Sequence, residues 1–425
     1  MILSKTNFFK ILSKISKPVV YNSLGSLFGI LSTILIARYF GSEKLGTVVL
    51  SLKILKILTV ICLFGFRQQI IKNISIFLKN KKFFQASNMI RNAKFFSSIT
   101  SIFIILSFIF ISQFQLNFYV RDSNLIPFLQ IFIFSLFFIV NTKLNSFILI
   151  SLKKFDKSVL FDGFFNTFFV LLFLVLVLTL EIQVSIQILA FIYLTSRLVN
   201  YFISNFSIKN KRLKSNQLNI DLSLIKKGKN FFQITVLNAL IVNIDLIIIS
   251  IILTPFEVAV YAVCTRISNI LSLVSYVISS IVSPNIATNF SDNKLYFLRN
   301  YLLKFLFFTI LLGSLFSFLA SFMSSQILSL WGSNFVIFSN VLIVMIVGST
   351  IQFVFSPYIH FLSLTGNQKK EFNLTSFVSI IYLVSLYLLT FYYGLVGSSY
   401  AFLIKNLFLN LSKFIISNHL LNKSR

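Results

Sequence analysis

One acid and one arginine lie within two long apolar stretches in the middle of the chain. Asp245 falls in "VLNALIVNIDLIIISIIL" (236–253), and Arg266 falls in the apolar stretch that follows the turn near residue 255. A charge of either kind at the centre of a membrane helix costs roughly 2.5–3.5 kcal/mol on insertion scales. Charged groups in such places bind ions or anionic ligands, carry protons or pair with one another. These two residues are therefore the first candidates for chemistry.

Asp245 has three possible roles. It could take up a proton during transport, bind a coupling cation such as sodium, or hold an arginine in place. Asp245 and Arg266 each lie about ten residues from the turn, so at 1.5 Å per residue both are about 15 Å deep and could pair. The sequence leaves these alternatives open.

More basic side chains lie at similar depths. Lys53 and Lys56, three residues apart, share one face of a predicted helix. Asp245 is the only acid that we place in the core of a span, so the predicted interior carries net positive charge, which favours an anionic ligand. Other basic residues in or near predicted spans include Arg38, Arg67 and Lys304, together with Lys143, Arg197 and Lys405, which we expect to extend to a membrane interface.

The composition is that of a membrane protein. The chain has 425 residues, of which 57% are hydrophobic and only 11% are charged, and its mean hydropathy is +0.90. A soluble domain carries about 25% charged residues. The net charge of +28 would suggest nucleic acid as the partner of a soluble protein. Here the lysines lie in short loops between apolar spans, so we expect no nucleic-acid partner.

Motifs for catalysis or metal binding are missing from the sequence. It contains no GxxxxGK[ST] phosphate loop, and its two histidines, His360 and His419, are far apart and outside any HExxH pattern. The two cysteines, Cys62 and Cys264, lie in apolar spans without metal-ligand spacing. We therefore expect a transporter rather than an enzyme, with no metal site and no cofactor.

The elements that must position these charges are transmembrane helices, each about 20 residues long. The loops 67–93, 153–157 and 206–229 carry 6, 3 and 7 Lys and Arg residues, whereas the opposite connections hold only Lys44 and Arg121. By the positive-inside rule, both termini are predicted to be cytoplasmic. The twelve predicted spans are 18–39, 46–66, 94–116, 125–150, 159–180, 182–205, 230–253, 258–283, 300–322, 335–358, 373–393 and 396–418.

The two halves of the chain resemble each other. "FGSEKLGTVVLSLKI" (40–54) aligns with "LTPFEVAVYAVCTRI" (253–267), which places Ser32 opposite Asp245 and Lys53 opposite Arg266. We therefore predict an all-α integral membrane protein of about twelve transmembrane helices, built as two six-helix lobes related by a parallel pseudo-repeat. The predicted parts are an N-terminal lobe at 1–205, a cytoplasmic basic linker at 206–229 and a C-terminal lobe at 230–425.

Three segments carry a family resemblance. "ILIARYFGSEKLGTVVLSLKI" (34–54), "LFGFRQQIIKNI" (63–74) and "NIDLIIISIILTPFEVAVYAVCTRI" (243–267) resemble the Wzx-type polysaccharide flippases of the multidrug/oligosaccharidyl-lipid/polysaccharide exporter superfamily. Ala259 departs from the glycine that is usual in that family after the second turn, and Leu63 stands where an acid is often found. In that family, cationic cavity residues are thought to meet the diphosphate of the substrate, and the matching positions are Arg38, Lys53, Lys56 and Arg266, with Asp245 as the acid.

The resemblance implies a function, a substrate and a location. Such a protein moves undecaprenyl-pyrophosphate-linked oligosaccharide repeat units to the outer leaflet of the bacterial cytoplasmic (inner) membrane by alternating access, for the assembly of O-antigen or capsule. Membrane lipids and the polysaccharide polymerase machinery are the other expected partners. A proton or sodium gradient and the membrane potential are the expected sources of coupling, with Asp245 as the coupling-ion or ion-pair residue and Ser32, Arg67 and Lys304 as secondary site residues.

Two alternatives remain. A multidrug or cation antiporter of the same superfamily would favour an acid-rich cavity, in contrast to one acid among several basic residues. A membrane glycan polymerase or ligase, which is a different class of protein, would be expected to carry a long outer loop with charged catalytic residues.

Overall fold

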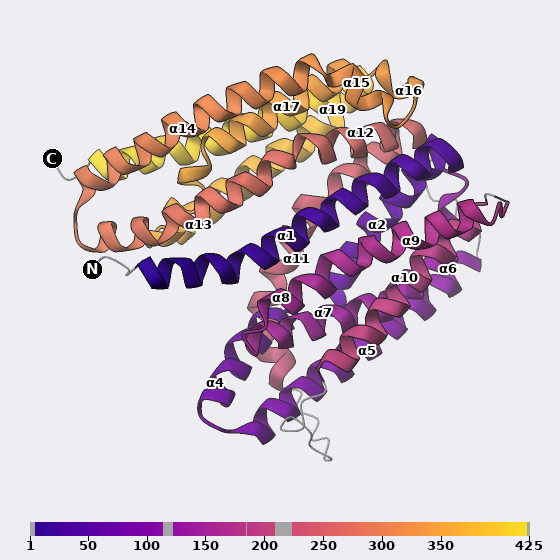
Figure 1. Cartoon of the computed structure of the whole chain (residues 1–425), viewed down its shortest axis with the longest axis horizontal. Helices are drawn as coiled ribbons and strands as arrows, with labels where there is room; N and C mark the ends of the chain where they lie inside the picture. The colour runs from indigo at the N-terminus through magenta and orange to yellow at the C-terminus, as the bar shows by residue number, and fades with distance from the viewer. Residues whose placement is uncertain (1–4, 114–121, 184, 209–222, 423–425) are drawn as a thin grey trace. The chain divides into compact units, whose positions relative to one another are not determined.

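The computed structural model describes residues 5–113, 122–183, 185–208 and 223–422 of the chain. The described residues form helices joined by short turns, with no β-strand among them (Figure 1). Helices are the expected form for an apolar chain in lipid, because they satisfy their backbone polar groups internally. Backbone contacts divide the chain into two compact units, Met1–Ile247 and Ile248–Arg425.

The first unit is built from helices that include three π-helical segments, η1, η2 and η3. Its elements are α1 (Lys5–Leu35), η1 (Ile36–Phe40), α2 (Ser42–Cys62), α3 (Phe66–Gln69), η2 (Ile70–Ile74), α4 (Ser75–Lys79), α5 (Phe83–Gln113), α6 (Leu125–Phe132), α7 (Ser135–Ser151), α8 (Phe155–Val159), η3 (Leu160–Phe164), α9 (Phe165–Thr179), α10 (Ile186–Ser207) and most of α11 (Ser223–Ile252).

The second unit contains a group of long helices in which α17 packs against both α14 and α19 (Figure 1). Its elements are α12 (Pro255–Ser268), α13 (Ile270–Ser291), α14 (Leu295–Phe322), α15 (Ser324–Ser329), α16 (Ser333–Val336), α17 (Ser339–Val354), η5 (Ser356–Tyr358), α18 (Phe361–Leu364) and α19 (Gln368–Asn422).

Many of these helices are long and apolar enough to cross a membrane. Among the described residues there are eight such helices, or ten spans if each of two bent helix pairs counts as one. The pairs are α6 with α7, bent by 53°, and Ser339–Val354 with Ser356–Leu364, bent by 50°. Every predicted span overlaps a helix, so the all-helical prediction is confirmed, although the predicted span 258–283 is divided between α12 and α13, neither of which is among these candidates. The number twelve and the orientation of the termini stay predictions.

The unit boundary differs from the boundary predicted between the lobes. Residues 209–222, which form most of the predicted linker 206–229, lie outside the described residues. The ends of that predicted linker belong to helices, because α10 continues to Ser207 and α11 begins at Ser223. Most of α11 groups with the first unit, although the internal repeat assigns this helix to the second lobe.

The start of α12 is encoded locally. The side-chain hydroxyl of Thr254 accepts a hydrogen bond from the Glu257 backbone N–H, and the Glu257 carboxylate accepts from the backbone N–H and the hydroxyl of Thr254. Pro255 occupies the first helical turn, where a missing N–H costs nothing. This capping box ends one apolar helix and begins the next within a few residues.

The two arms of α19 form a hairpin, so the predicted spans 373–393 and 396–418 lie within one continuous element. Gly394 interrupts the helix with φ 60° and ψ −141°, a conformation that a residue with a side chain rarely adopts. Near the far ends of the arms, the Lys413 ammonium lies 2.8 Å from the Glu371 carboxylate and also donates to the Ile359 carbonyl. This contact shows that the arms run antiparallel.

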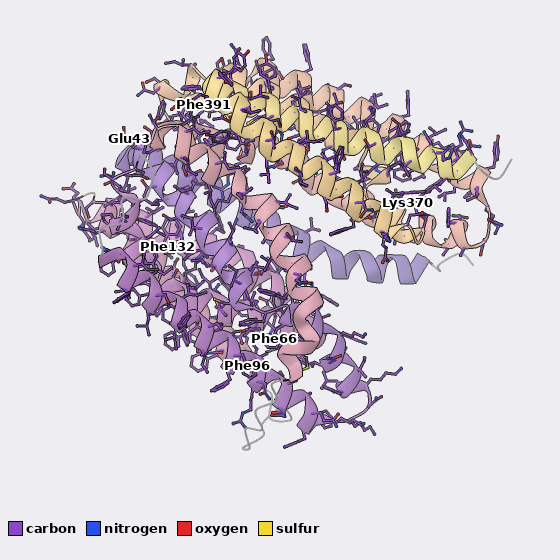
Figure 2. The ribbon with its side chains drawn as sticks, turned by 180° about the vertical axis from the view of Figure 1, so that it is seen from behind. Glu43, Phe66, Phe96, Phe132, Lys370 and Phe391 are labelled. Atoms are coloured by element: carbon purple, nitrogen blue, oxygen red, sulfur yellow. The ribbon has the colours of Figure 1, made fainter. Side chains whose placement is uncertain are left out.

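Large apolar side chains cover the outside as well as the core. Phe391, on the surface of α19, is 62% exposed, whereas Phe66 in the first unit is fully buried (Figure 2). Exposed aromatic and aliphatic side chains recur along α14 and α19. Such a surface is stable in hydrocarbon and would aggregate in water, so it fits a protein surrounded by lipid.

We expect Gly397→Ala to destabilise the hairpin of α19. A Cβ atom at Gly397 would lie only 1.9 Å from the Leu389 carbonyl oxygen, so the backbone must shift. Overpacking of this kind costs about 2–3 kcal/mol, and thermal unfolding in detergent should show a lower melting temperature. The control is Gly163→Ala, whose added carbon meets Asn22 Oδ1 at an ordinary 3.7 Å; equal melting temperatures for the two variants would contradict the expectation.

Candidate functional site

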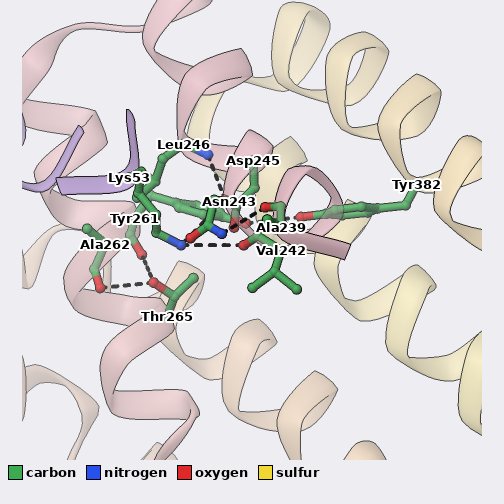
Figure 3. A network of polar contacts seen from close by, with 10 residues as sticks. All are labelled: Lys53, Ala239, Val242, Asn243, Asp245, Leu246, Tyr261, Ala262, Thr265 and Tyr382. Carbon is green, nitrogen blue, oxygen red and sulfur yellow. Dashed lines mark hydrogen bonds and ion pairs between the residues drawn. The ribbon is translucent and has the colours of Figure 1, made fainter. Parts of the chain in front are cut away.

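An ion pair joins two predicted site residues of the first unit. The Lys53 ammonium on α2 lies 3.8 Å from Oδ1 of Asp245 on α11 (Figure 3). The two side chains are 22% and 14% exposed, so both are largely withdrawn from the surface. Both residues stand well inside their helices, which is consistent with the depth predicted from the sequence.

Neighbouring backbone groups complete this pair. Lys53 Nζ also lies 3.5 Å from the Val242 carbonyl oxygen, and Asp245 Oδ1 accepts a 2.8 Å hydrogen bond from the Leu246 backbone N–H (Figure 3). Two residues before Asp245, Asn243 donates to the Ala239 carbonyl. Charges held away from water need such partners, because an unpaired charge in hydrocarbon costs several kcal/mol. At 3.8 Å the two charged groups are farther apart than in a direct hydrogen bond.

The other first-unit candidates are distributed along the helices. Arg38 on η1 and Lys56 on α2 are exposed, and each takes part in further contacts within the structure. Arg67 on α3 is also exposed, and its guanidinium carbon lies 5.7 Å above the Phe147 ring. Ser32 is buried and donates to the Phe28 carbonyl, so its hydroxyl serves its own helix. Within this unit, the structure brings Lys53 and Asp245 together as an ion pair.

In the second unit, the predicted basic residues have different surroundings. Arg266, in the last turn of α12, is half-buried. Lys304 on α14 is exposed, next to the exposed Leu303 and close to the exposed Phe307. A lysine with such apolar neighbours can extend its ammonium along the helix to a membrane surface. Pairing of Arg266 with Asp245 stays a prediction.

Asp162 was missed by the sequence analysis. It lies on η3 inside the candidate membrane helix Phe155–Thr179 and forms an ion pair with Lys143 of α7. Asp245 is therefore not the only acid within a candidate membrane helix, and Lys143 has a carboxylate partner, while its extension to an interface stays a prediction. A π-helical turn often marks a functional site, but the sequence "VLFDGFF" shows only an acid near a predicted helix start.

Arg197 and Lys405 also have surroundings that their sequence positions do not reveal. The Nε atom of Arg197 on α10 is buried. The Lys405 ammonium lies 4.4 Å from the centre of the Tyr382 ring, and the Tyr382 hydroxyl lies 3.4 Å from that of Tyr261 (Figure 3). An aromatic ring of its own unit therefore stabilises the charge of Lys405, and its extension to an interface stays a prediction.

A second polar contact ties a loop to α2. Thr47 Oγ1 donates to Asp122 Oδ2 at 2.7 Å, and the Asn124 backbone N–H donates to Oδ1. Burial raises the pKa of the Asp122 carboxyl above its ordinary value of 3.8, and the charge of Glu43 adds to the rise, although these two hydrogen bonds lower the pKa. Folding therefore favours the protonated form of Asp122.

No metal-binding cluster is evident in the described part of the chain. Over residues 5–113, 122–183, 185–208 and 223–422, no three His, Cys, Asp or Glu side chains gather in a way that could hold a metal ion. Cys62 and Cys264 are both buried, free thiols.

Solved transporter structures share this fold. An inward-facing multidrug resistance MATE family transporter of the MOP superfamily matches with a TM-score of 0.79 at 13% identity, over 94% of this chain and 95% of that one. The lipid II flippase MurJ, in its inward closed conformation, matches with a TM-score of 0.70 at 17% identity, over 95% and 90%. A MOP superfamily transporter from Pyrococcus furiosus, described by the reverse polarity of its binding pocket, gives 0.60 at 14% identity, over 95% of each chain.

These likenesses define the class of fold. No family model and no curated protein matches the sequence. The structural neighbours are transporters and flippases, so the chain has the fold of MOP superfamily transporters and is a multi-pass membrane protein. Identities of 13–17% define neither the substrate nor the branch of the superfamily.

We expect the Lys53–Asp245 pair to show coupling in a double-mutant cycle. Lys53→Gln or Asp245→Asn alone leaves one charge unpaired and should cost about 1–2 kcal/mol, between the values for exposed and fully buried pairs. The double variant should cost less than the sum. Thermal unfolding in detergent measures the loss of stability in the two single variants and in the double variant. The matched control is the exposed Lys294–Asp292 pair, for which no coupling is expected; additive effects at Lys53 and Asp245 would contradict the prediction.

We expect Asp122→Asn to remove part of the pH dependence of stability. Because the folded state has the higher pKa, the contribution of Asp122 to stability is fully present below pH 3.8 and is lost as the pH rises through the raised value. Each unit of pKa difference corresponds to about 1.4 kcal/mol. Asparagine keeps an acceptor for Thr47 but does not titrate. As the pH rises through this range, the melting temperature of Asp122→Asn should therefore fall less than that of the unmodified protein. Glu181→Gln, at an exposed turn, is the control, and an unchanged pH profile for Asp122→Asn would refute the assignment.

Proposed function

We propose that this protein translocates polyprenyl-pyrophosphate-linked oligosaccharide repeat units from the cytoplasmic to the outer leaflet of a bacterial inner membrane. The route is alternating access, and the product serves the assembly of a surface polysaccharide such as O-antigen or capsule. The observation that carries the proposal is the half-buried Lys53, held loosely by Asp245 inside a fold that is shared with a lipid II flippase.

The chemistry of the substrate explains why basic residues would be needed. A diphosphate brings negative charge and acceptor oxygens into the membrane, where ammonium and guanidinium groups bind it through charge-assisted hydrogen bonds. In the proposed mechanism, Lys53, Lys56 and Arg266 bind the diphosphate, with Arg38 contributing from η1. The polyprenyl tail stays in lipid. Transport requires no covalent step, metal or cofactor.

The ion pair gives Asp245 a part in the cycle. While Lys53 faces Asp245, its charge is balanced and the cost of holding it in the membrane is reduced. An arriving diphosphate competes with the carboxylate for the ammonium. Uptake of a proton or a sodium ion by Asp245 would release Lys53 further, which would couple substrate binding to an ion gradient. The membrane potential contributes about 2.3 kcal/mol per 100 mV for each negative charge moved outward.

A multidrug or cation antiporter remains the second candidate, because a MATE family transporter shares the fold with a TM-score of 0.79. The Lys143–Asp162 pair adds a second acid within a span, which a cation exporter would need. However, this acid is balanced by a lysine, so the interior of the first unit does not become acidic. A glycan polymerase or ligase is a weaker candidate, since the structural neighbours are transporters and flippases.

The decisive experiment locates the lipid-linked oligosaccharide in host cells that lack the gene. A membrane-impermeant reagent that modifies glycans should find the oligosaccharide protected on the cytoplasmic side, and surface polysaccharide should be lost. Unchanged glycan with altered drug tolerance would instead favour the antiporter.

In the same cells, we expect variants that lack the basic charges to restore little surface polysaccharide. Lys53→Gln combined with Arg266→Gln should reduce the return of surface polysaccharide at least about tenfold, because one charged hydrogen bond contributes about 1.5–3 kcal/mol. The control is Lys370→Gln, at an exposed lysine in the first turn of α19, which should restore polysaccharide fully (Figure 2). Full restoration by the double variant, at equal protein levels, would disprove the role of these charges.

A further inference from the structure

Within the first unit, a lysine extends into a cluster of amide and hydroxyl groups. Lys94 of α5 donates from Nζ to Asn205 Oδ1 of α10 at 3.4 Å. The same oxygen accepts from Asn145 Nδ2 of α7 at 3.0 Å, and this nitrogen also donates to Ser204 Oγ at 2.9 Å. Side chains from three helices therefore meet at one point, which we call the Lys94 cluster (Lys94, Asn145, Ser204 and Asn205).

The Lys94 cluster holds a positive charge without a matching negative one. Lys53, Lys143 and Lys413 each lie beside a carboxylate, but none of the described carboxylates lies within 4.0 Å of the Lys94 ammonium. An ammonium has three N–H donors, and Asn205 Oδ1 is the acceptor that the described residues supply. Asn145 is fully buried, and its Oδ1 also has no hydrogen-bond partner. The cluster is therefore incomplete in both charge and hydrogen bonding.

The cluster borders on lipid. α7 packs against both α5 and α10, and Lys94 crosses from one of these outer helices to the other. Phe95, the next residue on α5, is exposed, as are Phe202 and Phe206 on α10. These side chains flank the cluster with an apolar surface on which acyl chains can lie. A ligand that enters here would need an anionic head and an apolar body.

The depth of the cluster matches a lipid headgroup rather than the centre of the bilayer. Asn205 lies two residues before the end of α10 at Ser207. α5 begins at Phe83, directly after the basic turn that contains Lys79, Lys81 and Lys82. The cluster thus lies toward the end of the helices where basic loops gather, which the distribution of lysine and arginine predicts to be cytoplasmic.

We propose that the Lys94 cluster binds the phosphate of an anionic phospholipid from the leaflet at this end of the first unit. The phosphate accepts from the remaining N–H groups of Lys94 and balances its charge, as in basic pockets between transmembrane helices that bind lipid headgroups. The acyl chains lie along α5 and α10. The bound lipid is distinct from any transported substrate, so this site does not depend on the proposed function.

Native mass spectrometry of the full chain in detergent, with added phosphatidylglycerol or phosphatidylcholine of equal chain length, tests the proposal. The unmodified protein should retain phosphatidylglycerol preferentially. Lys94→Gln should weaken that retention about tenfold, the effect of losing one charge-assisted hydrogen bond. Lys370→Gln, at an exposed lysine in the first turn of α19, should retain the lipid as the unmodified protein does.

A second variant separates loss of binding from loss of folding. Asn205→Asp places a carboxylate 3.4 Å from the Lys94 ammonium and should satisfy it internally. This variant should lose preferential phosphatidylglycerol retention while keeping or raising its melting temperature in detergent alone. Equal retention of the two lipids, or unchanged retention in both Lys94→Gln and Asn205→Asp, would overturn the proposal. If inorganic phosphate or pyrophosphate were retained in native mass spectrometry as strongly as phosphatidylglycerol, the cluster would instead be assigned to a soluble anion.

Discussion

Hydrocarbon provides no hydrogen-bond partner and no screening for a charge, so a polar group inside a membrane protein must be satisfied by the protein itself or by a ligand. This constraint accounts for the arrangement of the charged side chains described above. Lys53 faces Asp245, Lys143 faces Asp162 and Lys413 faces Glu371, and each pair joins separate helical segments or the two arms of α19. These contacts link segments of the fold as well as neutralising charge.

Two of these three ion pairs lie beside helix irregularities, whereas Lys53 and Asp245 stand inside the helices α2 and α11. Asp162 lies on the π-helical segment η3, and Lys413 reaches the Ile359 carbonyl, where the helix α17 has already given way to η5 and α18. At such breaks the regular backbone hydrogen bonds are shifted or missing, so carbonyl groups become available to side chains. The transport proposed above would need segments that can change their packing. The polar contacts at these breaks are suited to hold one arrangement and release it.

Much of the fold could be predicted from the sequence because lipid imposes simple requirements on length and hydropathy. Each predicted span overlaps a helix, and the turn "TPFEV" between α11 and α12 encodes its own cap. The positions of Lys53 and Asp245 well inside their helices could be predicted by counting residues, but their pairing could not, because the sequence does not give the rotation of one helix about its axis relative to another. For the same reason, the contacts of Asp162 with Lys143 and of Lys405 with the Tyr382 ring could not be predicted. The Lys94 cluster combines residues from three helices that no local pattern connects.

The junction of the two arms of α19 has a consequence for how the protein enters the membrane. From Leu389 to Leu403 the chain contains no acidic or basic residue, and Gly394 provides the only reversal of direction. Because the segment that connects the arms has no charged residue, it carries no signal that would hold it on one side of the bilayer during synthesis. The first arm alone would therefore lack a topological signal at its far end. The two arms are suited to insert as a preformed helical hairpin, with the basic residues at its open end fixing the orientation of both.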